Sequence, residues 1–431
     1  MGLLNYAKQQ HIDSYYVASA GKIPDYPSLD GSMACDICIV GGGLAGISAA
    51  LNLAERGYAV VLLEGSKLSH AASGRNGGQV INGFACDMDT IARAVGESGA
   101  QEAWQMSLEA IDIIDERVRR HKIDCDWERG HVVAAVKPRK YQELVDWHEE
   151  ASTRFGYKHY QLWDQATLRS HLDSPRYAGG LYDELGGHIH PLKYALGLAR
   201  AAEAIGVKIF ENTPVTRIEQ GAEPKAITAT GTVSCKHLVL AANVFVGDLV
   251  PALDHKIMPV GTYVITTESL GEARAKSLIN PNFAVADNQF VLDYYRLTAD
   301  HRVLFGGKVS YSGLPPPNLK EAMRSDMLRV FPQLADVKIE HGWGGFVDIT
   351  MSRAPHWGRL SPNVYFCQGF SGHGVAVTGL AGKLIGEAIA GTSERLDLFA
   401  KIGHLPFPGG KLFRTPSLVM AMAWFRLRDY L

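Results

Sequence analysis

The first clear pattern in the chain is a short apolar run that ends in glycines. Residues 35–40 (CDICIV) predict a buried strand, and residues 41–46 (GGGLAG) predict a turn. Residues 47–56 (ISAALNLAER) place small and apolar side chains at helical spacing, and residues 58–63 (YAVVLL) are a second apolar run. Together these elements predict a βαβ unit, which requires parallel strands and a right-handed crossover.

Two kinds of sequence pattern alternate along the rest of the chain, one typical of helices with parallel strands and one typical of an antiparallel sheet. Helical patterns dominate residues 91–155, whereas residues 188–210 repeat strand, helix and strand. Residues 255–312 are rich in Tyr, Val, Thr and Phe with alternating stretches, the pattern of an antiparallel sheet. From residue 364 the chain returns to strand, glycine turn and helix. We therefore predict an α/β protein: a Rossmann-type nucleotide-binding domain built from separated segments, with an inserted antiparallel or mixed β-sheet domain.

The expected domain boundaries lie where one sequence pattern gives way to the other. The last segment contains SLVMAMAWFRLRDYL, whose apolar and aromatic stripe predicts a C-terminal tail helix. We expect this helix to dock on the protein, although a peripheral membrane contact uses the same pattern. The predicted segments are 34–90, 187–250 and 340–395 for the nucleotide-binding domain, 91–186 and 251–339 for the substrate domain, and 396–431 for the tail.

Composition and charge exclude several classes of protein. The 431 residues include 43 Lys and Arg against 45 Asp and Glu, a net charge of −2, so no basic field indicates nucleic acid as a partner. The N-terminus lacks the basic and apolar regions of a signal peptide, and no apolar run reaches the roughly 18 residues of a membrane span. Six scattered cysteines suit reduced thiols. We therefore expect a cytoplasmic protein.

Two residue pairs have the spacing of metal ligands but are expected to be structural. Cys35 and Cys38 form a CxxC inside the first predicted strand, and no second Cys or His pair follows at zinc spacing. His188 and His190 lie directly before Pro191, which begins a predicted helix. No metal site is predicted.

The first glycine turn carries a chemical signal. Gly41, Gly43 and Gly46 form a GxGxxG between strand and helix, and Glu64 ends the next strand. Gly41 allows the tight turn, Gly43 lets the backbone approach a pyrophosphate, and Gly46 lets the helix pack on the strand. The helix N-terminus attracts phosphates, and the acidic residue suits ribose hydroxyls. The pattern predicts a dinucleotide site.

A polar, glycine-rich stretch after the second strand favours FAD over NAD. A flavin extends beyond the pyrophosphate and needs backbone donors along its ribityl chain and ring edge, whereas a NAD domain usually continues into its next helix. No second glycine fingerprint is present for NAD(P)H. The residues expected to line the flavin are Ser73, Gly74, Arg75, Asn76, Gly77, Gly78 and Gln79.

Another glycine turn lies late in the sequence. Gly372, His373 and Gly374 belong to GFSGHG, and the residues that follow predict a helix whose N-terminus presents backbone amides to an anion. In a flavin enzyme, that anion is the N1 and O2 edge of the reduced ring. The turn is therefore expected at the flavin end of the cofactor.

These motifs resemble the D-amino-acid oxidase superfamily of flavoproteins, in its glycine oxidase and sarcosine oxidase branch. CDICIVGGG, ASGRNGGQ, GGHIHP, LDYYRLTAD and QGFSGHG resemble the bacterial enzymes that oxidise gamma-glutamylputrescine. The resemblance implies FAD, hydride removal from the CH–N bond of a small-molecule amine or imino acid, and hydrolysis of the imine. It also implies reoxidation by oxygen or a membrane electron carrier, and it places the backbone of Val215 beside adenine.

Departures from the family pattern bear on the substrate. Gln79, Val347 and Ala376 stand where relatives carry the Arg or Lys that binds a substrate carboxylate. An unpaired buried carboxylate is costly, so an amine remote from its carboxylate, such as gamma-glutamylputrescine, fits better than a small α-amino acid. L-pipecolate is the alternative if another cation binds its carboxylate, and a flavin-binding module without turnover is the third hypothesis. The other candidate cations are Arg75, Arg296, Lys308 and Arg353.

The resemblance also bears on flavin attachment and catalysis. Sarcosine oxidases attach their flavin to a Cys that corresponds to the region of Val347 and Asp348, so noncovalent FAD is expected. Their oxygen-activating Lys corresponds to Leu304, which favours a carrier as acceptor. We expect aromatic side chains to surround the amine through cation–π contact, although core packing explains the same residues equally well. The predicted catalytic residues are His373, Tyr295, Arg75 and Trp343, with Tyr294 beside them.

Overall fold

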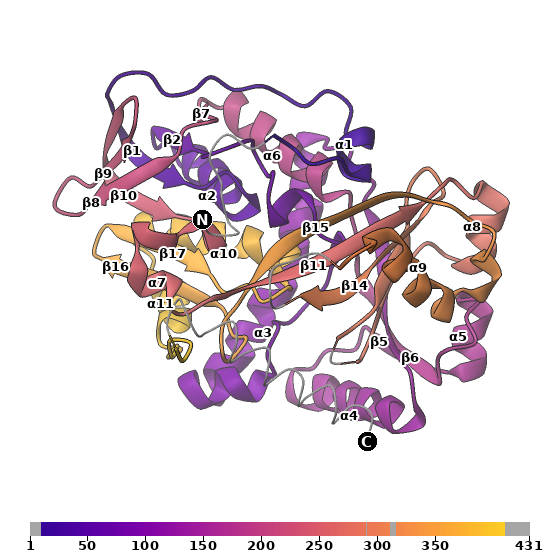
Figure 1. The fold of residues 1–431 in the computed structure, drawn as a ribbon. Coiled ribbons are helices and arrows are strands. Elements are labelled where there is room, and N and C mark those ends of the chain that lie inside the picture. The colour runs from indigo at the N-terminus through magenta and orange to yellow at the C-terminus, as the bar shows by residue number, and fades with distance from the viewer. Residues whose placement is uncertain (1–9, 290, 311–315, 410–431) are drawn as a thin grey trace.

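Two β-sheets form the framework of the protein, which we describe from a computed structural model (Figure 1). The structure describes residues 10–289, 291–310 and 316–409. The first sheet has eight strands, in the order β16-β17-β10-β1-β2-β7, with β9 paired to β10 and β8 to β9. The strands are β1 (Met33–Val40), β2 (Val60–Leu63), β7 (Lys208–Phe210), β8 (Val215–Glu219), β9 (Lys225–Thr228), β10 (Thr232–Leu240), β16 (His356–Ser361) and β17 (Val364–Gln368).

The central strands of the first sheet are parallel because helical crossovers join them. β1 pairs in parallel with β2 and with β10, and β2 pairs in parallel with β7. Helix α2 (Leu44–Glu55) connects β1 to β2, and α6 (Pro191–Ala204) precedes β7. The apolar sides of α2 and α10 (Gly374–Ile389) pack together in the first core, which also includes residues of α3 (Met88–His121). The predicted βαβ unit and the late helix are thus present.

The second sheet has nine strands and mixes parallel with antiparallel pairs. Its order is β15-β11-β14-β13-β12-β4-β6-β3, with β5 paired to β6. Figure 1 shows the long β11 and β15 reaching from the first sheet toward α8 (Glu272–Leu278) and α9 (Leu319–Val330). The strands are β3 (Gln79–Val80), β4 (Glu128–Ala135), β5 (Tyr160–Asp164), β6 (Gly179–His188), β11 (Met258–Thr267), β12 (Ala284–Asp287), β13 (Tyr294–Leu297), β14 (Val303–Ser310) and β15 (Ile339–Ile349).

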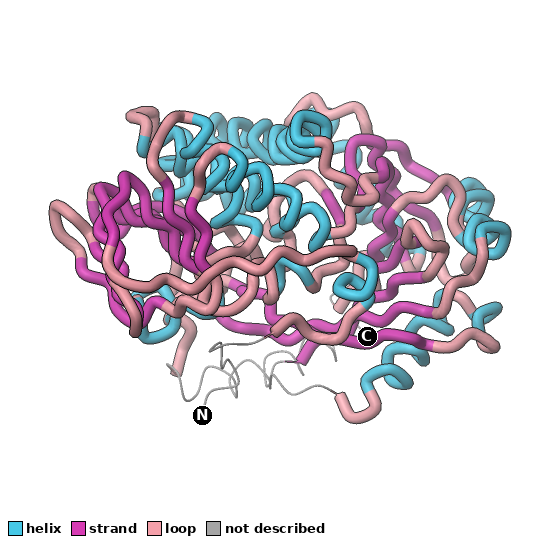
Figure 2. The backbone as a smooth tube through the Cα atoms, turned by 90° about the horizontal axis from the view of Figure 1, so that it is seen from above, coloured by secondary structure: helices cyan, strands magenta, loops and turns pink. Residues whose placement is uncertain are grey.

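Figure 2 shows the strands gathered at opposite sides of the molecule, with helices covering the space between and around them. A second core, formed by β13, β14, the helix α9 and neighbouring elements, lies apart from the first. The remaining helices are α1 (Tyr15–Ser19), α4 (Pro138–Arg154), α5 (Gln165–His171), α7 (Pro251–Asp254), α8 (Glu272–Leu278), α9 (Leu319–Val330) and α11 (Glu394–Ala400). The α/β fold class with two sheets is confirmed.

The observed segments differ from the predicted boundaries at two places. Residues 339–349 form β15, which pairs along its length with β11 in the second sheet, so the chain returns to the first sheet only at His356. Helix α3, expected in the substrate domain, contributes Ile91, Trp104 and Ile114 to the first core. Both differences arise from long-range pairing, which periodicity within a segment does not reveal.

The cysteines and histidines singled out above lie in the framework. Cys35 and Cys38 lie on β1, and all six cysteines are free thiols. His190 is the N-cap of α6, where its Nδ1 accepts from the backbone amide of Lys193 at 3.1 Å. In the described part of the chain, no group of three or more His, Cys, Asp or Glu is arranged to hold a metal ion.

Within the described residues, no single helix is long and apolar enough to cross a membrane. Helices α10 and α11 taken together have the length and apolar composition of a membrane span, but a bend of 118° separates them. The tail helix expected over SLVMAMAWFRLRDYL lies outside the described residues.

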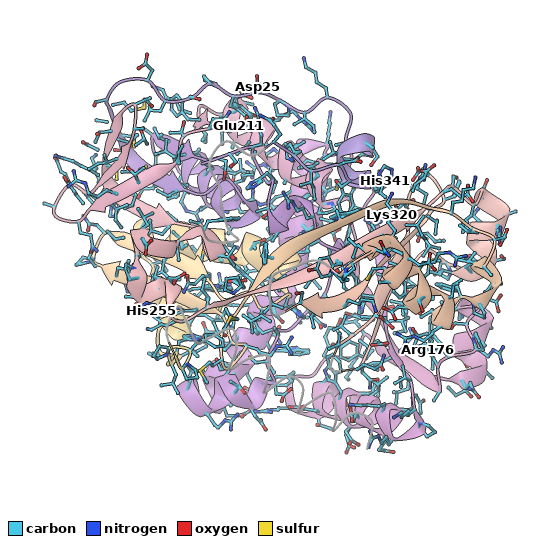
Figure 3. All side chains as sticks on the ribbon, viewed as in Figure 1. Asp25, Arg176, Glu211, His255, Lys320 and His341 are labelled. Carbon is cyan, nitrogen blue, oxygen red and sulfur yellow. The ribbon has the colours of Figure 1, made fainter. Side chains whose placement is uncertain are left out.

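A buried ion pair fastens the N-terminal segment to the edge of the first sheet. Glu211 is 1% exposed and accepts from Lys67 Nζ at 2.8 Å and from the backbone amide of Leu68 at 2.7 Å. Its carboxylate also accepts from the amide of Tyr26 at 3.3 Å. Lys67 pairs in addition with Asp25, and Figure 3 labels Asp25 and Glu211 close together on this side of the molecule.

Replacing Glu211 by Ala should destabilise the protein by about 3–5 kcal/mol, because it leaves two buried backbone amides without their acceptor and the Lys67 ammonium with only the exposed Asp25 as its partner. Asp25→Ala is the matched control, since the Asp25 side chain is 85% exposed and should cost less than about 1 kcal/mol. Urea unfolding of both variants measures the difference. Equal losses of unfolding free energy would show that the buried pair is not what fastens this segment.

Candidate active site and cofactor cavity

An elongated cavity lies at the carboxyl ends of β1, β2 and β10, the edge at which parallel sheets bind nucleotides. Three sequence-distant glycine and polar turns meet there: the turn after β1, the stretch after β2, and the turn before α10. The predicted cofactor residues that line it are Gly41, Gly43, Glu64, Ser73, Asn76, Val215, Gly372 and Gly374.

Glycines are required at the first turn because other atoms occupy the space of a side chain. A Cβ on Gly46 would lie 1.9 Å from the carbonyl oxygen of Gly41, and one on Gly43 would lie 2.8 Å from Ser73 Oγ. Gly41 has φ of +112°, a conformation that L side chains rarely adopt. The N-terminus of α2 therefore approaches the cavity as bare backbone, as a pyrophosphate requires.

Glu64 keeps acceptor capacity toward the cavity. Its Oε2 accepts from the amide of Gly42 at 2.7 Å, and its Oε1 accepts from the amide of Ser66 at 2.8 Å. Burial raises the pKa of Glu64, and these two backbone hydrogen bonds oppose the shift. An ionised carboxylate has about four acceptor positions, so the remaining ones suit the hydroxyls of a ribose.

The predicted flavin-binding stretch of residues 73–79, hereafter the flavin strip, is held by hydrogen bonds to helix α2 beside the first sheet and to the second sheet. Ser73 Oγ accepts from the amide of Leu44 in α2 at 2.9 Å, whereas Gln79 lies on β3 of the second sheet. Asn76 Oδ1 accepts from the amide of Gly78 at 2.8 Å. Gln79 donates to the carbonyl of Val285 at 2.8 Å. The strip thus bridges the two sheets along the cavity.

Asp348 organises the turn before α10. The carboxylate of this residue on β15 is 2% exposed, lines the cavity, and accepts from the amides of Gly369 and Phe370. Burial raises its pKa to about 6, and the donated hydrogen bonds limit that rise. No Cβ of Gly372 would meet another atom within 4 Å, so this glycine faces open space.

His373 has a defined proton position. Its Nε2 lies 2.7 Å from the carbonyl oxygen of Asn82, which can only accept, so Nε2 carries the proton and Nδ1 is the acceptor of the neutral ring. Burial lowers the pKa of His373 to about 4, so the ring is neutral near pH 7. Asn82 in turn accepts from Tyr160 Oη at 2.8 Å and donates to Asp183 at 3.4 Å.

The two adjacent tyrosines of β13 face opposite sides of the second sheet. Tyr295 is fully buried in the second core, stacked on Phe305 with ring centroids 5.8 Å apart. Tyr294 lies on the side of the flavin strip, where its ring would collide with a Cβ on Gly77 at 2.4 Å. The structure therefore does not bring Tyr295 to the site, and Tyr294 takes its place among the candidates.

Trp343 and Arg75 are coupled at the wall of the site. Trp343 on β15 is 3% exposed and donates from Nε1 to the carbonyl of Arg75 at 2.9 Å, so it supports the strip as part of the core. The Arg75 guanidinium donates to the carbonyl of Gly344 at 3.3 Å, while its buried Nε has no partner within the described chain. Burial lowers the pKa of Arg75 to about 10.

Together, the glycine cradle, the ribose acceptor and the extended strip define a dinucleotide-binding flavoprotein site, and the residues present fit FAD. A family model described as "FAD dependent oxidoreductase" (DAO) matches residues 36–388. The chain therefore belongs to this family of oxidoreductases, and FAD is its cofactor.

Individual proteins resemble the chain over nearly its whole length. It is 44% identical over 423 residues to the gamma-glutamylputrescine oxidoreductase of Escherichia coli K12, which covers 98% of this chain and 99% of that protein. It is 43% identical over 432 residues to "Probable oxidoreductase OrdL" of Haemophilus influenzae, with 99% of both chains covered. The glycine oxidase structure from Bacillus cereus has a TM-score of 0.70 at 20% identity, covering 85% of this chain and 98% of that chain, and shows the shared fold.

Several residues of the site were not predicted from the sequence. Asn82, which fixes the His373 tautomer, carries no spacing signal of its own. Arg296 is expected from the sequence only as a candidate cation for a substrate carboxylate, whereas it binds the strip. Asp348 was considered only as a flavin-attachment position, yet it holds the turn before α10. The signal that was available is the alternation of Tyr294 and Arg296 on one strand, which places both on one face.

Gly46→Ala should weaken FAD binding at least about tenfold, or about 1.4 kcal/mol, because the added methyl group pushes α2 away from the turn. Gly403→Ala is the matched control, since a Cβ there meets nothing within 4 Å. The ratio of flavin to protein absorbance after dialysis measures retention. A Gly46→Ala protein that keeps its flavin as the control does would contradict the tight-turn argument.

Asp348 should make the apoprotein lose stability as pH rises. Its folded pKa of about 6 lies above the ordinary pKa of an Asp side chain, 3.8, so its stabilisation is complete below that lower value and is lost as pH rises through about 6. Between pH 5 and pH 7.5 the loss should be about 1.4 kcal/mol. Urea unfolding of wild type and Asp348→Asn at both pH values isolates it, since the variant lacks this titration. The same pH dependence in both proteins would refute the assignment.

Proposed function

We propose that this protein oxidises the CH–N bond of an amine whose carboxylate is remote from the reacting carbon, with gamma-glutamylputrescine as the substrate. The observation that carries the proposal is the 44% identity, over nearly the full chain, to a protein named for that substrate. The apolar wall supports it, because Phe346 and Val347 line the cavity where relatives are expected to carry a carboxylate-binding Arg.

The protein's own residues supply binding and hydrogen-bonding groups around the cofactor. FAD, when bound, supplies a two-electron acceptor for the hydride. The amine must be neutral to lose that hydride, and His373, whose Nε2 donates to the carbonyl of Asn82, offers Nδ1 as a hydrogen-bond acceptor that orients the N–H of the neutral amine. The ring of Tyr294 beside the strip offers a cation–π surface to the arriving ammonium.

The candidate cations differ in the groups that they already bind, and this difference favours Arg75 as the contact for the distant carboxylate. Arg296 donates to backbone carbonyls and Tyr16, and Lys308 pairs with Asp326 at 2.5 Å. Arg75 pairs with no acid in the described chain and flanks the cavity-lining Ser73 and Asn76. A charge-assisted hydrogen bond from it to a carboxylate would satisfy its buried Nε.

FAD is proposed to be noncovalent. Among the described residues that line the cavity there is no cysteine, and Cys367 is 2% exposed on β17. Leu304, at the position of the oxygen-activating Lys, is fully buried, which supports a carrier rather than oxygen as electron acceptor.

The function is tested by mixing the holoenzyme anaerobically with gamma-glutamylputrescine, putrescine, L-pipecolate and sarcosine in separate runs. Flavin absorbance should bleach rapidly with the glutamylated amine and at least about tenfold more slowly with the others. Bleaching by L-pipecolate instead would favour the cyclic amino acid, and bleaching by none would favour a module without turnover. Admitting air afterwards tests the acceptor, because slow recovery of the absorbance is expected if a carrier is used.

Arg75→Gln should raise KM for gamma-glutamylputrescine about 10- to 100-fold, the loss of one charge-assisted contact. The KM for putrescine should stay unchanged, because putrescine has no carboxylate. Arg353→Gln is the control, since Arg353 is an exposed arginine on the turn after β15. Flavin content is measured first so that cofactor loss is not mistaken for a binding defect. An unchanged KM in Arg75→Gln, or an increase in Arg353→Gln, would place the carboxylate elsewhere.

A further inference from the structure

A buried arginine, considered above only as a cation for the substrate carboxylate, binds the flavin strip. Arg296 lies on β13, two residues beyond Tyr294 and on the same face, and is 2% exposed. Its Nε donates to the carbonyl of Gly77 at 2.9 Å, and its Nη2 donates to the carbonyl of Ile189 at 3.0 Å. Nη2 also donates to Tyr16 Oη at 3.2 Å, and Nη1 donates to the carbonyl of Leu297 at 3.2 Å.

All four of these acceptors are uncharged oxygens. In the part of the chain that the structure describes, no ion pair includes Arg296. A guanidinium stays protonated in proteins, so the side chain is a buried positive charge without a carboxylate partner. Its field reaches the neighbouring histidines: burial, followed by Arg296, lowers the pKa of His188 and of His190 to about 3. A buried charge without an ionic partner costs free energy that hydrogen bonds to neutral oxygens offset only in part.

The contacts of Arg296 determine how the strip presents its backbone. Gly78 has φ of +76°, and a Cβ there would lie 3.1 Å from Arg296 Nη2 and 2.1 Å from the carbonyl oxygen of Ile189. The amide of Ile189 donates to the carbonyl of Gly78 at 2.8 Å. Tyr16 Oη, itself bound by Arg296, donates to the carbonyl of Asn76 at 2.7 Å. The carbonyls of three consecutive strip residues are therefore occupied by these partners.

We propose that Arg296 is a positioning residue for FAD and also the fixed positive charge that stabilises the reduced flavin. The proposal rests on the placement of the flavin ring along the strip. Because the carbonyls of Asn76, Gly77 and Gly78 all accept hydrogen bonds from these partners, the strip is held in a single conformation beside the cavity. Adding a hydride to the neutral oxidised flavin adds one negative charge, so a nearby unneutralised cation favours the reduced form.

Three variants separate the two roles. Arg296→Gln removes the charge and most of the hydrogen bonds, Arg296→Lys keeps the charge but not the planar set of donors, and Tyr16→Phe keeps Arg296 and removes one hydroxyl. Arg169→Gln, an exposed arginine on α5, is the control for a change in net charge. Each holoenzyme is reduced anaerobically by dithionite in the presence of a reference dye, and the dissociation constant of FAD is measured separately.

Arg296→Gln should lower the equilibrium constant for two-electron reduction at least tenfold, which is about 30 mV. Arg296→Lys and Tyr16→Phe should keep that constant within about threefold but weaken FAD binding by about three- to tenfold. The control should change neither quantity. A potential unchanged in Arg296→Gln would overturn the charge role, and unchanged FAD binding in all three variants would overturn the positioning role.

If Arg296→Gln yields no holoenzyme, Arg296→Lys and Tyr16→Phe test the charge role and the positioning role in its place. A reduction constant that falls tenfold in the lysine variant, where the charge persists, would refute the charge role. FAD binding equal to wild type in both would refute the positioning role. Because these readouts need no substrate, they stand even if the proposed amine does not reduce the flavin.

Discussion

Hydrogen bonds to the backbone of the flavin strip hold the whole site together. The strip lies between helix α2, which packs beside the first sheet, and the second sheet, and both contribute donors to it. Leu44 of α2 binds Ser73 from the side of the first sheet, and Arg296 and Trp343 bind it from the second. Since backbone groups left unpaired in a buried position cost free energy comparable to a lost hydrogen bond, neither sheet can shift alone without breaking these contacts.

The electrostatics of the site follow from the same arrangement. Burial keeps His373 neutral and raises the pKa of Asp348, while Arg296 remains charged without a carboxylate in the described chain. Positive potential therefore comes from a fixed guanidinium and from the N-terminus of α10, rather than from side chains that titrate near pH 7. Such an environment stabilises a cofactor that gains negative charge and leaves the Nδ1 of a neutral imidazole free to accept a hydrogen bond.

Much of the fold was predictable because its signals are local. The βαβ unit depends on the spacing of Gly41, Gly43 and Gly46 between two apolar runs, and steric contact within a few residues enforces that spacing. The place of β15 in the second sheet was not predictable, because pairing with β11 depends on residues that lie far apart in sequence. Neighbouring tyrosines 294 and 295 show a second limit. A strand buried on both faces gives no alternation of polar and apolar positions, so the sequence alone does not decide which tyrosine faces the cavity.

We propose that an extended FAD joins the two sheets, with its adenine near Val215 and its flavin ring between the strip and the turn at Gly372. A crystal structure of the holoenzyme tests this most directly. We predict continuous density for FAD along that path, with Glu64 hydrogen-bonded to the ribose and no covalent bond from the flavin to a protein side chain. Density that leaves the path before the strip, or a flavin ring placed away from residues 73–79, would contradict it.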